Sequence, residues 1–117
     1  MTRKVFNLLF GEALAESDKD RFISEWATSS VFDTDPDGPS PDYDSIDKML
    51  DNIWWVAHLS ISDIKAHTGM TTAALAERFC IPVRTLENWC GGQRSAPDYL
   101  RLMIADLLGL VTVERVP

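Results

Sequence analysis

Two stretches of this chain carry residues whose types and spacing could do chemistry. In the first, VRTLENWC, four residues fall on one face if the segment is helical: Val83, Arg84, Glu87 and Asn88. Arginine pairs with guanine, asparagine with adenine, and glutamate with the amino group of cytosine in a major groove. This face is therefore a candidate for reading base edges.

The second stretch is the aspartate-rich segment DTDPDGPSPDYD, residues 33–44. Asp33, Asp35, Asp37, Gly38 and Asp44 match positions 1, 3, 5, 6 and 12 of a calcium-binding EF-hand loop. However, position 12 is an aspartate instead of the longer bidentate glutamate, and three prolines stiffen the segment. We expect a solvated acidic loop, and calcium binding is the alternative.

Other kinds of chemistry lack their residue patterns. The chain shows no nucleophile beside a base, no carboxylate pair within a motif, and no glycine-rich loop leading into a helix. The two histidines and two cysteines do not have zinc-ligand spacing. We therefore expect neither an enzyme nor a bound cofactor or metal, and we expect two buried free thiols in a cytoplasmic protein.

The charge is distributed unevenly along the 117 residues. The net charge of -7 opposes nucleic-acid binding, because neutralised phosphates supply most of the affinity of such proteins. Residues 1–59 hold five Lys or Arg against twelve Asp or Glu, whereas residues 60–117 hold six of each. The excess acid thus belongs to the first half. No apolar run approaches the roughly 18 residues of a membrane span, so we expect no membrane contact.

The elements that would position these residues are short helices. In the first half we expect a short helix at the N-terminus, a helix over about 18–29 capped by Ser17, and a helix from Ser45 to about Leu59. In the second half the pattern predicts helices over 62–68, 72–79, 83–90 and 98–108. Three of these helices end at glycines, Thr71 caps the second and Pro82 precedes the third. The tail LVTVERV predicts a short strand or an extended arm.

The segment LAERFCIPVRTLENWCGGQR, followed by Ala-Pro and an aromatic residue, resembles the Cro/repressor (XRE-type) helix-turn-helix family. The resemblance covers about residues 60–109, with the helix-turn-helix at 71–91. It implies a compact bundle of about five short helices and a homodimeric transcriptional regulator of a phage or mobile element. It also implies DNA-contacting residues. Thr72, Gln93, Arg94 and Ser95 would contact phosphates, and Val83, Arg84, Glu87 and Asn88 would read bases.

Two residues depart from the family pattern. Cys80 stands where glycine is usual, so a residue with a Cβ must accept a positive φ at a cost of order 1 kcal/mol. Cys90 stands where a glutamate usually follows the tryptophan, which removes an ion pair with Arg94. The freed arginine would then either serve DNA or merely be disordered.

The sequence thus predicts an all-α protein with an acidic N-terminal helical region, 1–43, and a helical domain, 44–117. The first functional hypothesis is a sequence-specific binder of double-stranded DNA, acting as a homodimer in the cytoplasm. The alternative is a protein-interaction module whose acidic first half docks a basic protein partner on a helix-turn-helix scaffold.

Overall fold

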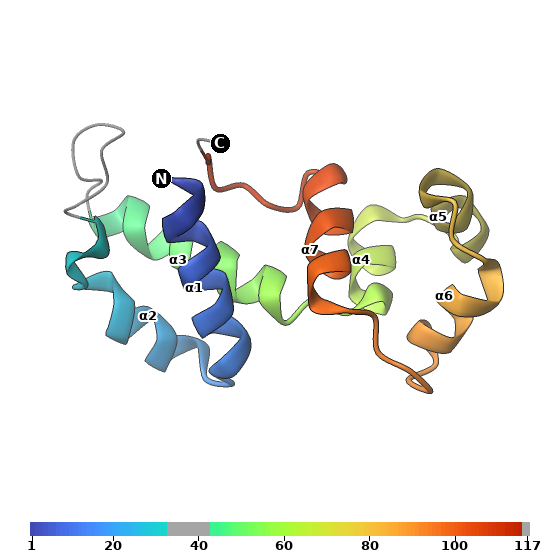
Figure 1. Cartoon of the computed structure of the whole chain (residues 1–117), viewed down its shortest axis with the longest axis horizontal. Helices are drawn as coiled ribbons and strands as arrows, with labels where there is room; N and C mark the ends of the chain where they lie inside the picture. Colours follow the sequence, from blue (N-terminus) through green and yellow to red (C-terminus); the bar gives the residue numbers. More distant parts are fainter. Residues whose placement is uncertain (33–42, 116–117) are drawn as a thin grey trace. The chain divides into compact units, whose positions relative to one another are not determined.

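A computed structural model describes residues 1–32 and 43–115 and divides the chain into two compact units (Figure 1). Unit 1 comprises Met1–His58 together with Val111–Pro117, and unit 2 comprises Leu59–Leu110. The division differs from the boundary near residue 43 that the sequence predicted. Helix α3, Tyr43–Ala57, packs against α1 and α2, and this packing places it in unit 1.

The described residues are helical and contain no strand, in agreement with the predicted all-α class. The described residues of unit 1 form three α-helices and one 3₁₀ helix: α1 (Arg3–Ala15), α2 (Lys19–Ala27), η1 (Ser30–Phe32) and α3 (Tyr43–Ala57). Unit 2 contains four α-helices: α4 (Ile61–Thr68), α5 (Thr72–Phe79), α6 (Val83–Cys90) and α7 (Asp98–Leu107). None of these helices combines the length and apolar composition needed to cross a bilayer.

The core of unit 1 forms where the apolar faces of its three α-helices meet. Phe6 and Leu9 of α1 and Leu50 and Ile53 of α3 are fully buried, and Phe22 of α2 is nearly so. Burying each such side chain contributes roughly 1.5–3 kcal/mol. These contacts join segments that are far apart in the sequence.

The C-terminal segment completes unit 1 as an extended strap, residues 111–115, which does not form the alternative short strand. Val113 is buried, and the Thr112 N–H donates to Asn52 Oδ1 at 3.0 Å. The Arg115 guanidinium lies over the Phe6 ring, 4.7 Å from its centroid. The strap thus closes a unit whose other residues precede unit 2 in the chain (Figure 1).

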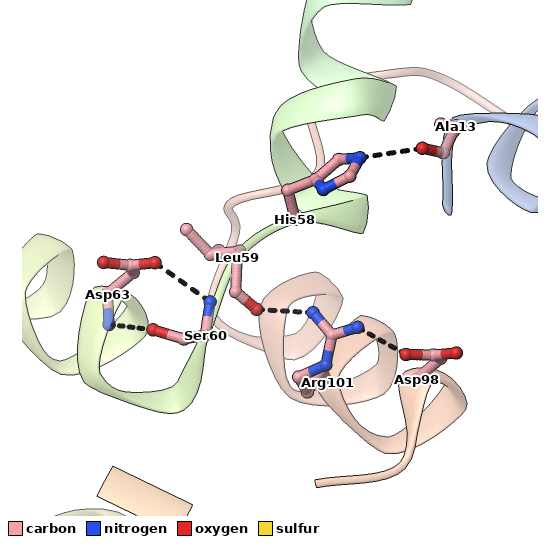
Figure 2. Close-up of polar contacts among 7 residues, drawn as sticks. All are labelled: Ala13, His58, Leu59, Ser60, Asp63, Asp98 and Arg101. Carbon is pink, nitrogen blue, oxygen red and sulfur yellow. Dashed lines mark hydrogen bonds and ion pairs between the residues drawn. The ribbon is translucent and has the colours of Figure 1, made fainter. Parts of the chain in front are cut away.

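A histidine fastens the end of α3 to the end of α1 (Figure 2). His58 Nε2 lies 2.8 Å from the Ala13 carbonyl oxygen and 3.0 Å from that of Glu16. Because a carbonyl can only accept, Nε2 carries the hydrogen and donates. The His58 ring also stacks on Trp54, whose Nε1 donates to Glu16 O at 2.8 Å. The carbonyl oxygen of Glu16, the C-cap residue of α1, thereby accepts hydrogen bonds from both Trp54 and His58.

Unit 2 begins with a helix that is capped at both ends. Ser60 and Asp63 form a reciprocal capping box at the start of α4, and Gly69 ends the helix with a left-handed φ of 71° (Figure 2). Arg101 of α7 donates to the Leu59 carbonyl oxygen at 2.6 Å and pairs with Asp98. Arg101 therefore ties α7 to the segment that leads into α4.

The predicted helices are present, with several differences at their ends. Asp18 caps α2 instead of Ser17, because its carboxylate accepts the N–H groups of Asp20 and Arg21. Helix α3 begins at Tyr43, so Ser45 lies inside it. Unit 2 has four helices instead of about five, since the chain turns at Gly109 and enters the strap. The EF-hand interpretation falls mostly on residues 33–42, outside the described residues.

Candidate nucleic-acid interface

Helix α5 and the turn after it hold the candidate interface in place. Thr71 caps α5 as predicted, with its hydroxyl accepting the Ala74 N–H at 3.1 Å. Leu75 and Ala76 face inward and are buried. Cys80 then takes the left-handed conformation, with φ 54° and ψ 40°, and this confirms the strained turn expected from its position. The chain thereby passes from α5 to α6 within three residues.

The environment of the two cysteines differs from the prediction. Cys80 is exposed, and Cys90 at the end of α6 is half-buried, so the prediction of two buried thiols is wrong. Both cysteines are free thiols.

Helix α6 presents one face to the protein and another to solvent. Leu86 is fully buried and Trp89 half-buried, so this side anchors the helix. Among the predicted base-reading residues, Val83 is 44 % exposed, Arg84 and Glu87 are exposed, and Asn88 is partly exposed. The structure therefore brings all four onto the outer face of one helix.

The loop that follows α6 folds back on the helix end. The Asn88 carbonyl oxygen accepts N–H groups from Gln93 at 3.1 Å and from Arg94 at 3.4 Å. A Cβ on Gly91 would lie 3.2 Å from the Glu87 carbonyl oxygen, so this position favours glycine. Gln93, Arg94 and the following Ser95 are exposed. Gln93 and Arg94, two of the predicted phosphate-contacting residues, are thus hydrogen-bonded to Asn88, one of the predicted base-reading residues.

A side-chain hydrogen bond also holds the end of α6 against α4. The Ser62 hydroxyl donates to the Cys90 carbonyl oxygen at 3.2 Å, and α4 and α6 pack against each other. This bond satisfies one of the carbonyl groups that a helix C-terminus leaves without an intrahelical partner. Helix α6 is therefore positioned by its buried face and by its last turn.

The predicted phosphate contact at Thr72 involves a residue that the sequence analysis did not identify. Lys65 of α4 donates from Nζ to Thr72 Oγ1 at 2.7 Å, which places an ammonium group at the N-terminus of α5. The Thr72 hydroxyl accepts this bond and keeps its own hydrogen to donate. The seven-residue separation of Lys65 and Thr72 spans a helix end and a turn, so helical spacing alone could not pair them.

The charges of unit 2 balance. Residues 59–110 hold five basic and five acidic side chains: Lys65, Arg78, Arg84, Arg94 and Arg101 against Asp63, Glu77, Glu87, Asp98 and Asp106. Arg101 already pairs with Asp98 and donates to the Leu59 carbonyl oxygen. The Arg78 guanidinium lies 5.7 Å from the centroid of the Phe79 ring. Arg84 and Arg94 are exposed on α6 and its following loop. They and Lys65 are the cations placed to meet an anion.

Within residues 1–32 and 43–115, no three His, Cys, Asp or Glu side chains are grouped so that they could hold a metal ion. Unit 1 has an open pocket of about 480 Å³ that combines acidic and aromatic side chains. It is lined by Ile23, Asp47, Lys48, Asp51, Asn52, Trp55 and Thr112. Among known proteins, no family model, curated protein or solved structure matches this chain.

Proposed function

We propose that the protein is a sequence-specific binder of double-stranded DNA, which acts in the cytoplasm as a homodimeric transcriptional regulator of the Cro/repressor type. The observation that carries the proposal is the outer face of α6. Leu86 anchors this helix while Val83, Arg84, Glu87 and Asn88 point away from the core. An exposed helix of this kind fits the width of a major groove.

Each exposed residue has a defined part in the proposed contact. Arg84 donates to the O6 and N7 acceptors of guanine, and Asn88 makes a bidentate contact with adenine. Glu87 accepts from the amino group of cytosine, and Val83 contacts a thymine methyl group. The carboxylate of Glu87 also disfavours phosphates and misplaced bases, so it adds to discrimination and not to overall affinity.

The phosphate backbone is contacted on both sides of this face. Lys65 and Thr72 meet a phosphate at the N-terminus of α5, and Gln93, Arg94 and Ser95 meet another beyond α6. Two contacts of this kind fix the register of the helix in the groove. Because unit 2 is neutral overall, its DNA affinity depends on these few cations and falls with salt in proportion to the number of phosphates they contact.

The proposal is tested by selecting binding sites from random duplexes and measuring mobility shifts of the selected duplex. Arg84→Ala removes one base contact and is expected to cost about 1–3 kcal/mol and to relax the preference at one base pair. Arg94→Ala is expected to weaken all sequences alike and to lower the salt slope by about 1. Arg78→Ala, which removes an equal charge from α5, is the matched control and should leave base preference unchanged.

A second candidate function rests on the acidic pocket of unit 1. Asp47 and Asp51 line it beside Trp55 and Lys48, Asp51 pairs with Lys19, and all the excess acid of the chain lies in the first half. A lysine- or arginine-rich peptide would find carboxylates for its cations and an aromatic face for cation–π contact. Titration with an oligo-arginine peptide, followed by tryptophan fluorescence, tests this candidate. Asp47→Asn should weaken the interaction, whereas Glu77→Gln in unit 2 should not.

A further inference from the structure

The strap belongs to unit 1, yet the chain reaches it only after passing through the whole of unit 2. Unit 2 is therefore inserted within the chain of unit 1 and joined to it at both ends. The two connections leave little spare chain. Leu59 directly follows His58, whose ring bonds to the end of α1. Val111 alone separates Leu110 from the hydrogen-bonded Thr112 of the strap. The end of unit 2 thus fixes where the strap begins.

Helix α7 is bonded to both ends of unit 2. Near the start of this helix, Arg101 donates to the Leu59 carbonyl oxygen at 2.6 Å and so fixes the entry to unit 2 (Figure 2). Beyond its last turn, the Leu110 N–H donates to the Ala105 carbonyl oxygen at 2.9 Å, and Gly109 supplies the left-handed φ of 79° that such a helix end needs. While unit 2 is folded, one helix therefore sets the distance between its entry and its exit.

The strap itself is held by a limited set of contacts with unit 1. Val113 is its one buried side chain. The Thr112 N–H donates to Asn52, and the Arg115 guanidinium lies over the Phe6 ring. The conformational entropy lost when an extended segment is ordered opposes these contacts. We therefore expect the strap to stay bound only while the start of the strap is already held close to unit 1.

We propose that folded unit 2 holds the strap on unit 1, and that unfolding of unit 2 releases the strap while the rest of unit 1 stays folded. With unit 2 unfolded, the strap can bind only by closing a flexible loop of about 50 residues. Closing a loop of this length lowers the equilibrium constant for strap binding by up to about a thousandfold. An extended segment with one buried side chain does not offset such a loss.

Release of the strap also changes the pocket of unit 1. Thr112 lines this pocket, and so does Asn52, which accepts the hydrogen bond from Thr112. The pocket is therefore complete only while unit 2 is folded. Because coupling between two sites is reciprocal, a molecule that binds the pocket against Thr112 also stabilises folded unit 2. This coupling runs through the covalent chain and holds whether or not unit 2 binds DNA.

Hydrogen exchange of the Thr112 amide, followed by NMR on the full chain, measures strap release, because this N–H is bonded to Asn52. Leu86→Ala removes a fully buried side chain of α6 and should speed exchange of the Leu75 amide of α5 at least about thirtyfold. Exchange at Thr112 should rise by a similar factor. Leu107→Ala makes the same substitution at a leucine of unit 2 that is 63 % exposed, and this matched control should leave both rates nearly unchanged.

The Ile53 amide inside α3 separates strap release from unfolding of the whole chain. In Leu86→Ala, exchange at Ile53 should rise much less than exchange at Thr112. Should this variant fail to fold, low concentrations of urea on the unmodified chain give the same comparison, with Thr112 and Leu75 sharing one urea dependence. An unchanged Thr112 rate beside a faster Leu75 rate overturns the proposal. Equal acceleration at all three amides overturns it as well, since the chain then unfolds as one.

Substitution of Arg101 tests the part assigned to α7. Arg101→Met removes the bond that fixes Leu59, so the start of the strap is less restricted even while unit 2 is folded. Exchange at Thr112 should therefore rise at least about tenfold more than exchange at Leu75. Asp98→Asn keeps the bond to Leu59 and should leave the Thr112 rate nearly unchanged. Equal effects of Arg101→Met on the two amides show that Arg101 only stabilises unit 2 and overturn its positioning role.

Discussion

Replacing Cys80 with glycine should stabilise the protein. Cys80 has φ 54° and ψ 40°, and it is the one non-glycine residue with positive φ among the described residues. The left-handed conformation costs a residue with a Cβ about 1–2 kcal/mol. Glycine removes this cost but gains about 0.4–1 kcal/mol of freedom in the unfolded chain. Because the thiol is exposed, little packing is lost, and the net gain is about 0.5–1 kcal/mol.

Thermal unfolding followed by far-ultraviolet circular dichroism measures this gain. For a unit of this size, 0.5–1 kcal/mol corresponds to a rise in Tm of roughly 2–8 °C. Cys80→Ala keeps the Cβ and should melt close to the unmodified protein, so it separates backbone strain from loss of the thiol. Cys80→Val should melt lower, since β-branching makes positive φ more costly. A glycine variant that melts no higher than the alanine variant would refute the strain argument.

Three further substitutions test contacts within each of the two units. Val113→Ala should destabilise unit 1 by about 1.5–2.5 kcal/mol in urea unfolding, because Val113 is the buried side chain of the strap; the exposed Glu114→Ala should cost less than about 0.5 kcal/mol. Arg101→Met should lower the free energy of unfolding by about 1.5–3 kcal/mol, because the hydrogen bond to the Leu59 carbonyl is lost. Asp98→Asn should lower it by less than about 1 kcal/mol, because the Asp98 carboxylate is exposed. Equal losses for the two variants would contradict this assignment. The hydrogen bond and charge of Asp51 raise the pKa of Lys19. The pair therefore adds stability at pH values below the ordinary lysine pKa, and this stability is lost as the pH rises through the raised pKa. Asp51→Asn should lower the Lys19 pKa in an NMR titration, and an unchanged pKa would disprove the pairing.

The helices of unit 2 could be predicted from sequence because local signals define their ends. Thr71 at a cap, Pro82 before a helix, and glycines after helices each act within one turn, and the predicted bounds of α5 and α6 agree with the structure. The positive φ at Cys80 was expected from the resemblance, since the helix-turn-helix family usually has a glycine at this position. Such features depend on neighbouring residues, which the sequence states directly.

Features made by distant residues could not be predicted in this way. The placement of α3 in unit 1 depends on its packing against α1 and α2, and the strap depends on contacts between Thr112 and Asn52 and between Arg115 and Phe6. The Lys65–Thr72 bond joins two helices across a turn. No local periodicity encodes these pairs, since each arises only when the tertiary fold brings the elements together.

In the proposed function, the outer face of α6 enters a DNA groove. The most direct measurement compares the affinity of the protein for a selected duplex with its affinity for a scrambled duplex of equal length, each over a series of salt concentrations. We expect the protein to prefer the selected duplex by at least about a thousandfold, and the Arg84→Ala variant to show a much smaller preference. Equal, weak binding of both duplexes at every salt concentration would contradict it.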